Sequence, residues 1–365
     1  MLITLENPTE IAQSIKSFVE NDAALISIGE ETVIDIKSLI KSLNKQEISF
    51  IGGIFPMIIC NNDVHKKGII VNRLRNVIHL STIKNICSKN YAITPINFNL
   101  NSHYSLITYV DGLTHNISDF LSELYENYGM KTTYLGGGAG SFSLKQKPCV
   151  FSKDGFYEDA AVVCVCKTKS SIGVKHGWEK LEGPFTVTKA NQNTIEEINW
   201  ENPFSIYKEV VEADSGCKFK KDNFFDLANG YPLGIIKEDN EHIIRDPLHI
   251  HDDQFLVCVG QVEENNMIDI MKGENDSLIN AAKIATQEVV EQAENPKNAI
   301  IIDCISRILF LQDDFKFELK NVSQTIQNKF PNLEVCGAMT LGEISSYGNG
   351  YIEFYNKTIV VGLFE

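Results

Sequence analysis

The sequence predicts an α/β (α+β) protein made of two pseudo-repeated halves, each a mixed β-sheet flanked by helices. Strand and helix patterns recur in the same order in the middle and at the end of the chain, and glycine-bearing strands stand at corresponding places. A length of 365 residues suits two domains, each with its own core. The repeats are spaced too widely and irregularly for a solenoid, so they indicate a duplicated globular unit.

The middle copy contains four elements. Residues 105–110 form an apolar strand pattern, 117–128 an amphipathic helix, 132–140 a glycine-bearing strand and 160–166 a closing strand. The last copy has the same order: strand 299–304, helix 319–330, strand 333–338, a loop with Gly348 and Gly350, and strand 358–363. A fainter third copy opens the chain, with strand 24–28, helix 36–43, Gly52 and Gly53, and strand 68–71.

The two halves are predicted to meet near residue 200. Residues 185–190 and 194–198 alternate as strands around a turn, which predicts a hairpin. Pro203 then suits the first turn of a helix over 204–211. We therefore divide the chain into domains 22–200 and 201–365.

Composition limits the classes of partner. A formal charge of −15 without a Lys/Arg cluster disfavours nucleic acid and anionic membrane surfaces. No apolar run is long enough for a membrane helix, and the N-terminus lacks the pattern of a signal peptide. Most of the nine cysteines lie in apolar strands, as small buried hydrophobes do. We expect a cytoplasmic protein.

Short blocks along the chain carry a family resemblance. The blocks YLGGGAG (134–140), GVKHGWE (173–179) and GPFTVT (183–188) resemble the FIST N-terminal domain, in order and spacing. The segment 203–210, YPLG (231–234), RDP (245–247), DCISR (303–307), GEI (342–344) and YNKT (355–358) resemble the FIST C-terminal domain. FIST stands for F-box and intracellular signal transduction, and the resemblance covers nearly the whole chain from about residue 22.

The resemblance implies a sensory protein of the stand-alone prokaryotic type. Such domains bind small ligands, with amino acids proposed, and report to histidine kinases or cyclic-dinucleotide signalling enzymes. One branch is associated with haem and nitric-oxide sensing. We expect the chain to bind an amino-acid-like ligand and to act on a separate partner, without catalysing a reaction. The segment 51–56 departs from the family's usual small residues.

The glycine run 136–140 has three interpretations. A phosphate cradle needs a helix directly after the glycines, which the sequence does not suggest here. Close backbone packing or positive φ is the commoner reason for such glycines. The third interpretation places the amides of Gly138 and Gly140 in the wall of a ligand cleft.

The end of the strand 299–304 supplies the other candidate ligand-binding residues. Arg307 can bind a ligand carboxylate in bidentate fashion, with Glu343 or Asp303 on the amine side and Cys304 beside them. A structural Arg307–Glu343 salt bridge is an equally good interpretation. An enzyme that uses Cys304, or the Arg307–Glu343 pair, is the competing function class, although no G-x-S-x-G motif occurs.

Histidines offer two weaker candidates. His176 is a candidate haem ligand with Trp178 beside it, but one histidine defines no haem site. His249 and His251 share one strand face before two aspartates, a pattern that suits a metal as well as a solvent-facing edge. No third ligand is evident, so we predict no metal, and the cofactor stays unassigned.

Overall fold

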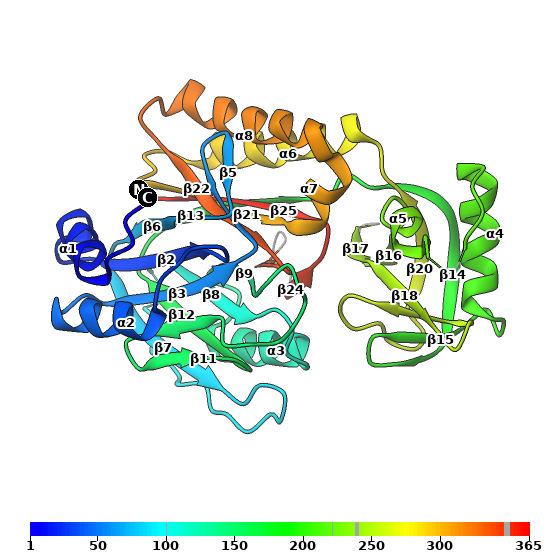
Figure 1. Ribbon diagram of the computed structural model, residues 1–365, viewed down its shortest axis with the longest axis horizontal. Coiled ribbons are helices and arrows are strands. Elements are labelled where there is room, and N and C mark those ends of the chain that lie inside the picture. Colours follow the sequence, from blue (N-terminus) through cyan, green and yellow to red (C-terminus); the bar gives the residue numbers. More distant parts are fainter. Residues whose placement is uncertain (100, 221, 238–240, 347–350) are drawn as a thin grey trace.

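The computed structural model describes residues 1–99, 101–220, 222–237, 241–346 and 351–365. Within them the chain forms three six-stranded mixed sheets and one seven-stranded antiparallel sheet, with helices packed around them (Figure 1). The predicted α/β class is confirmed. The predicted glycine loop with Gly348 and Gly350 lies outside the described residues.

Repeat 1 occupies residues 1–74. Its elements are β1 (Leu2–Ile3), α1 (Pro8–Val19), β2 (Ala23–Gly29), α2 (Ile36–Lys45), β3 (Phe50–Phe55), the hairpin β4 (Met57–Cys60) and β5 (Asp63–His65), and β6 (Ile69–Leu74). Strands β2 and β3 are connected by α2 and pair in parallel, and β6 pairs antiparallel with the other edge of β2.

Repeat 2 follows the same plan over residues 77–166. It contains β7 (Val77–Lys84), β8 (Tyr104–Asp111), α3 (Ile117–Tyr128), β9 (Thr132–Ala139), the hairpin β10 (Val150–Ser152) and β11 (Gly155–Tyr157), and β12 (Ala160–Cys166). Strands β8 and β9 are parallel, and β12 is antiparallel to β8.

Repeat 3 is interrupted after its first strand. It comprises β13 (Ser170–Lys175), α6 (Asn275–Gln292), β21 (Asn298–Cys304), α7 (Ile305–Leu311), the 3-10 turn η2 (Gln312–Asp314), α8 (Phe315–Lys329), β22 (Val335–Thr340), the hairpin β23 (Glu343–Ser346) and β24 (Ile352–Tyr355), and β25 (Ile359–Phe364). Strands β21 and β22 are parallel, and β25 is antiparallel to β21. The matching element order of the middle and last copies is therefore confirmed, and the faint first copy is complete.

Each repeat donates its hairpin to a neighbour. Strand β4 of repeat 1 pairs with β22 of repeat 3, β10 of repeat 2 pairs with β3 of repeat 1, and β23 of repeat 3 pairs with β9 of repeat 2. The exchange is cyclic, so each six-stranded sheet contains strands from two repeats. We call the three repeats together the body.

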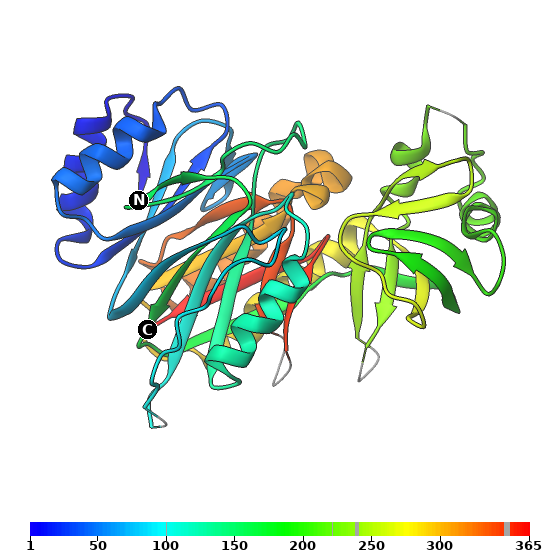
Figure 2. The ribbon, with the colours of Figure 1, turned by 90° about the horizontal axis from the view of Figure 1, so that it is seen from below.

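The interruption of repeat 3 forms an inserted domain over residues 179–272. It contains β14 (Glu179–Asn191), β15 (Thr194–Ile198), α4 (Pro203–Ser215), α5 (Phe224–Ala228), β16 (Leu233–Ile236), β17 (His242–Arg245), β18 (Pro247–His251), β19 (Phe255–Cys258) and β20 (Met267–Lys272). Glu179 and Lys272 pair where the chain enters and leaves, and the domain stands at one end of the body (Figure 2).

The predicted hairpin and helix start lie in this inserted domain. Strands β14 and β15 pair antiparallel as expected, and Pro203 occupies the first turn of α4, capped by the Asn202 side chain. The predicted division near residue 200 falls between β15 and α4. Strands from both sides of it share one sheet, because β15 pairs with β19.

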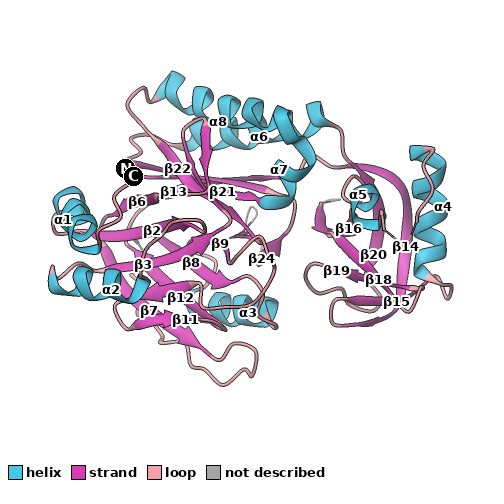
Figure 3. Cartoon of the chain, viewed as in Figure 1, coloured by secondary structure: helices cyan, strands magenta, loops and turns pink. Residues whose placement is uncertain are grey.

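Successive residues of the body strands point alternately into a core shared by the three sheets and into separate cores between each sheet and its helices. Inner-facing residues of the three body sheets meet in one shared cluster, which includes Leu25, Ile107 and Ile300. Their outer-facing neighbours, which include Ile26, Leu106 and Ile301, pack in three separate clusters. These clusters contain α1 and α2, α3, or α6 and α8, and Figure 3 shows the helices on the outside of the body. Burial on both faces explains why these strands are continuously apolar. None of the described helices is long and apolar enough to cross a membrane.

One glycine in the second strand of each parallel pair (β3, β9 and β22) has the same structural cause. Gly52 lies opposite Ile26, Gly136 opposite Thr108, and Gly337 opposite Ile301. At each position a Cβ atom would collide with the carbonyl oxygen of the opposing first-strand residue. The two backbones approach so closely that only glycine fits. The packing interpretation of the glycine run is therefore the one that the structure favours, and Gly52 in the divergent first copy has the same role.

Candidate functional site

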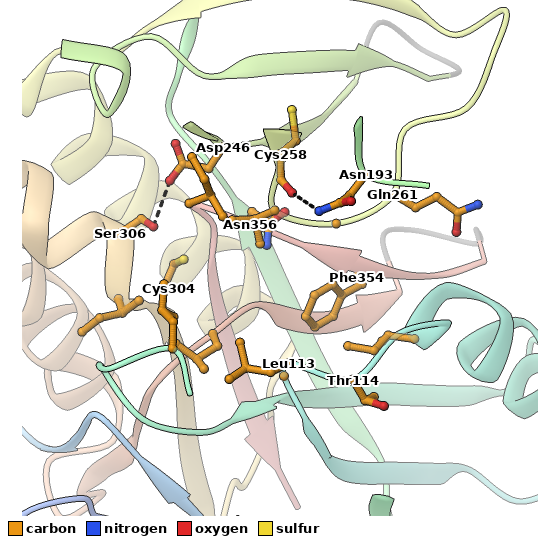
Figure 4. A pocket seen from close by; sticks show the side chains of 18 of the residues that line it. Leu113, Thr114, Asn193, Asp246, Cys258, Gln261, Cys304, Ser306, Phe354 and Asn356 are labelled. Atoms are coloured by element: carbon orange, nitrogen blue, oxygen red, sulfur yellow. Dashed lines mark hydrogen bonds between the residues drawn. The ribbon is translucent and has the colours of Figure 1, made fainter. Parts of the chain in front are cut away.

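A pocket of about 560 Å³ lies where repeats 2 and 3 face the inserted domain (Figure 4). The body contributes residues 112–118 after β8, Phe142, Leu144, residues 304–306 at the start of α7, Leu309, Leu341, Phe354 and Asn356. Because β8 and β21 are first strands of parallel βαβ units, these loops follow their carboxyl ends. Such ends are where open α/β sheets place ligands.

Asp111 holds the loop of repeat 2 that borders the pocket. Its carboxylate accepts hydrogen bonds from the amide of Leu113 (3.1 Å), the amide of Asp159 (2.9 Å) and the side chain of Gln146 (2.8 Å). Asp111 itself is buried, at 1% exposure. Asp111 therefore ties the start of the loop 112–118 to Gln146 and Asp159.

The inserted domain supplies the opposite wall. Its lining residues are Gln192, Asn193, Phe225, Asp246, Leu248 and 258–261. The Asn193 side chain donates to the carbonyl of Cys258 (2.9 Å), which ties the β14–β15 turn to the segment after β19 (Figure 4). Apolar side chains make up much of both walls, and a few polar groups stand among them, as in small-molecule sites.

Asp246 connects the two walls. Its Oδ2 accepts a hydrogen bond from the hydroxyl of Ser306 (3.2 Å) and pairs with Nζ of Lys357 (3.2 Å). Burial raises the pKa of Asp246, and the Lys357 charge partly offsets this. Among the described lining residues Asp246 is the one carboxylate, and none is Lys or Arg.

Lys357 fixes Asp246 from behind the pocket. The Lys357 side chain is fully buried, and it also donates to the carbonyl (3.0 Å) and side-chain oxygen (2.6 Å) of Asn229. Its ammonium group lies 4.8 Å from the ring centroid of Trp178. A residue of repeat 3 therefore holds two residues of the inserted domain, Asn229 and Asp246, through one buried cation.

Cys304 borders the pocket in front of Glu343. Glu343 is buried, and it accepts hydrogen bonds from Oγ1 of Thr340 (2.9 Å) and the amide of Thr358 (3.2 Å). Burial raises the pKa of Glu343 to about 8. Burial, and secondarily the nearby Glu343 carboxylate, raise the pKa of the Cys304 thiol. The thiol is therefore protonated at neutral pH, which makes it a weak nucleophile.

Comparison with protein families identifies the two parts of the chain. The FIST N domain matches residues 81–201, and the FIST C domain matches residues 203–346. The chain belongs to the FIST family. FIST domains are sensory and signalling domains, and these matches identify no ligand. No curated protein matches the chain.

Both FIST domains contribute to the pocket. The FIST N range supplies 112–118 and Asn193, and the FIST C range supplies Asp246 and 304–306. Repeat 1 lies outside both matched ranges, although its strand order equals that of the other two repeats. The FIST N and FIST C matches meet inside the inserted domain, between β15 and α4.

In this FIST protein the Arg307 side chain is buried and bonded to other groups of the protein. Its five N–H groups donate to both carboxylate oxygens of Glu318 (3.1 and 2.5 Å) and to three carbonyls, those of His176 (2.5 Å), Lys357 (3.2 Å) and Leu278 (3.0 Å). Asp303 lies 3.4 Å from the Arg307 Nε. All five donors are occupied, so the expected clamp on a ligand carboxylate has no free donor. The partner of Arg307 is Glu318, where the sequence suggested Glu343.

Most of the other predicted ligand residues are also engaged or buried away from the pocket lining. The amide of Gly138 donates to the carbonyl of Gly342 (2.8 Å), and that of Gly140 donates to the carbonyl of Ile54 (2.8 Å). Neither amide is free for the expected anion-binding wall. Asp303 and Glu343 are fully buried behind the pocket, and of the predicted set only Cys304 lines it.

The predicted histidine sites do not reach the pocket. Nδ1 of His176 accepts a hydrogen bond from the amide of Trp178 (3.0 Å), and the His176 ring packs edge-on against that of His242, with ring centroids 6.3 Å apart. His176 is absent from the described pocket lining, so it cannot serve as the axial ligand of a haem bound in this pocket. His251 pairs with exposed Asp252 (3.4 Å), and within the described residues no group of metal-ligating side chains assembles.

Sequence reasoning missed the acidic residue of the pocket. Asp246 and Asn356 belong to the RDP and YNKT blocks that carried the family resemblance, yet neither was assigned to the site. An acidic residue between arginine and proline is the signal that was available. The residues 112–118 gave a weaker signal, as a polar stretch directly after a buried strand.

Proposed function

We propose that this FIST protein is a cytoplasmic sensor that binds a small, amine-bearing, amino-acid-like ligand in the pocket between body and inserted domain. It binds the ligand without transforming it and reports to a separate partner protein. A histidine kinase or a cyclic-dinucleotide enzyme is the partner class that the family resemblance favours. The observation that carries the proposal is the pocket itself, which joins both FIST domains.

The chemistry of the lining supports an amine rather than a carboxylate as the recognised group. Asp246 supplies a carboxylate, and among the described lining residues no Lys or Arg is available to meet an acid. His115, exposed on the loop 112–118, is the one lining side chain of the described set that can gain a positive charge. The apolar walls, with Leu248, Leu341 and Phe354, suit an aliphatic or aromatic body. This revises the expected geometry: Asp246 replaces Asp303 and Glu343 on the amine side.

The arrangement also bears on how binding is reported. A ligand that touches Asp246 and residues 304–306 contacts both the inserted domain and the body. Its binding energy would favour one relative orientation of the two. The raised pKa of Cys304 supports binding over nucleophilic catalysis, which is the competing class.

A thermal-shift experiment with three matched probes tests the ligand class. Phenethylamine, phenylalanine and phenylpropionic acid share an aromatic body and differ in their charged groups. We expect the amine and the amino acid to raise Tm and the acid to have no effect. A ligand at 100 times its Kd stabilises the folded state by about 2.7 kcal/mol, which such a measurement resolves.

Pocket variants provide the control. Leu309→Trp fills the pocket from α7 and should abolish the shift, whereas Ile284→Trp, on an exposed position of α6, should retain it. A ligand whose shift survives Leu309→Trp binds elsewhere and contradicts the proposed site. A turnover of any probe that Cys304→Ala abolishes would instead favour the enzyme class.

A further inference from the structure

Two cysteines face each other where repeat 1 joins repeat 3. Cys60 ends β4, the hairpin strand that repeat 1 donates, and Cys336 lies in β22 of repeat 3. The antiparallel register places Cys60 directly opposite Cys336. Both are free thiols. Neither of them lines the ligand pocket.

The backbone bonds show which kind of opposed pair this is. One residue further along, the Asn61 amide donates to the Val335 carbonyl (2.7 Å), and the Val335 amide donates to the Asn61 side chain (3.1 Å). Positions 61 and 335 are therefore a hydrogen-bonded pair, and alternation makes 60 and 336 a non-hydrogen-bonded pair. In such pairs the Cα atoms are about 4.5 Å apart, which lies within the range that a disulfide spans.

The two thiols differ in access and in chemistry. Cys60 is partly exposed, whereas Cys336 is buried at 2% exposure. A hydrogen bond with Cys336 lowers the pKa of the Cys60 thiol to about 7, against the effect of burial. The same hydrogen bond, followed by burial, raises the pKa of Cys336. The accessible sulfur is thus the one that ionises near neutral pH, and the buried sulfur keeps its proton.

We propose that Cys60 and Cys336 form an oxidant-responsive dithiol site, at which hydrogen peroxide closes a disulfide across β4 and β22. The Cys60 thiolate attacks one peroxide oxygen, the O–O bond breaks and hydroxide leaves, which gives a sulfenic acid at Cys60. The Cys336 sulfur then attacks the Cys60 sulfur. The S–S bond forms, the S–O bond breaks, and the oxygen leaves as water with the Cys336 proton. Two electrons pass from the thiols to peroxide, and a cellular dithiol reverses the step by exchange.

Oxidation would make one of the three strand pairings between repeats covalent, the pairing of β4 with β22. The disulfide links repeat 1 covalently to repeat 3 through β22, the strand that leads to Leu341 in the pocket wall. A second close pair, Cys164 and Cys166 (Sγ–Sγ 3.7 Å), is fully buried within one strand and offers an internal comparison. Cys164 and Cys166 are two residues apart on one extended strand, so they do not lie opposite each other on neighbouring strands as Cys60 and Cys336 do.

Peptide mapping of the full-length protein after brief peroxide treatment tests the site. We expect a 60–336 disulfide peptide, removed by dithiothreitol, and no 164–166 disulfide. At pH 6, iodoacetamide should alkylate Cys60 about tenfold faster than in the Cys336→Ala variant, because the lowered pKa raises the thiolate fraction more than it reduces nucleophilicity. In that variant peroxide should leave a sulfenic acid at Cys60 that dimedone traps.

Cys336→Ala changes a buried residue and could disturb folding, so a second variant is needed. Cys60→Ser supplies it, because Cys60 is partly exposed. It should melt like the unchanged protein without peroxide and should form no disulfide at Cys336. A treated protein in which Cys60 is oxidised beyond sulfenic acid, or unmodified, while Cys336 remains a free thiol would overturn the proposal. Equal alkylation rates with and without Cys336 would also overturn it.

Discussion

Repeats 1 and 3 have the same strand order but very different interiors. The buried polar side chains of residues 1–74 are Ser27 and Asn72, which are both uncharged. Repeat 3 buries five ionisable side chains: Asp303, Arg307, Glu318, Glu343 and Lys357. Repeat 3 also carries the inserted domain and one wall of the pocket, whereas no pocket-lining residue comes from repeat 1 within the described part of the chain.

This difference shows what the topology requires and what the site requires. Repeat 1 shows that the βαβ unit with its closing strand is built with an apolar core. Buried ions cost desolvation energy that apolar residues avoid, so the charges of repeat 3 are not needed for that topology. Their positions suggest the reason: they join α7, α8 and the inserted domain behind the pocket wall.

The largest expected effect comes from breaking the central ion pair of repeat 3. Arg307→Ala leaves Glu318 and Asp303 buried without a cation, and such changes cost about 3–5 kcal/mol in the free energy of unfolding. The counterpart in repeat 1 is Arg73→Ala, which breaks partly exposed pairs with Asp22 and Glu20 and should cost at most about 1 kcal/mol. Urea denaturation measures both, and equal losses would remove the distinction between the two repeats.

Glycine substitutions should separate backbone contacts from side-chain contacts. At Gly337 an added Cβ would meet the Ile301 carbonyl, which cannot move without shifting β21. At Gly53 in repeat 1 it would meet the far atoms of the Phe55 ring at 2.9 Å. We expect Gly337→Ala to cost about 3 kcal/mol, the upper end of the range for overpacking, and Gly53→Ala about 1 kcal/mol. Thermal unfolding of the two variants checks the order, which a larger loss at Gly53 would reverse.

The pH dependence of stability should carry the signature of Glu343. Its pKa of about 8 in the folded state exceeds that of an unfolded glutamate, so the folded state keeps a proton that the unfolded state releases. This contribution to stability is present below the unfolded pKa and is lost as the pH rises to about 8. The free energy of unfolding should therefore fall relative to Glu343→Gln by about 1.4 kcal/mol per pH unit.

Measuring from pH 6.5 to 8 isolates this effect. Below pH 6.5 the buried His176, whose pKa burial lowers to about 3, acts with the opposite sign, because only the unfolded state gains its proton, but His176 is present in both proteins and its effect cancels in the difference. The Cys60 thiol, with its pKa of about 7, is common to both proteins and cancels in the difference. A difference between the two proteins that does not change with pH would show that Glu343 is ionised when folded.

The sequence allowed the repeat to be recognised because its strands are apolar on both faces. Helix 117–128 and strand 160–166 were predicted with the bounds that the structure has. The cyclic exchange of hairpins was not predictable, since β4, β10 and β23 are short and their partners lie in other repeats. The inserted domain was not recognised either, because β13 pairs with β25, which is almost 200 residues away in the sequence.

The site was predicted less well, for a physical reason. Arg307 and Glu343 were selected because charged residues near a strand end suggest ligand contacts, but sequence does not reveal whether their hydrogen bonds are already occupied. The same holds for the amides of Gly138 and Gly140. Cys304, selected at the end of β21, lines the pocket, and Asp246 was missed because the junction of β17 and β18 lies in the inserted domain.

The hairpin exchange has a consequence for the growing chain on the ribosome. Strand β3 acquires β10 as its neighbour only once residues 150–152 have emerged, and β4 must wait for 335–340, which are made much later. During that time apolar strand edges of repeat 1 remain unpaired, and unpaired edges are the surfaces through which nascent chains aggregate. Strands made early therefore depend on strands made much later for protection, and a product truncated before residue 335 should be a preferred client of chaperones.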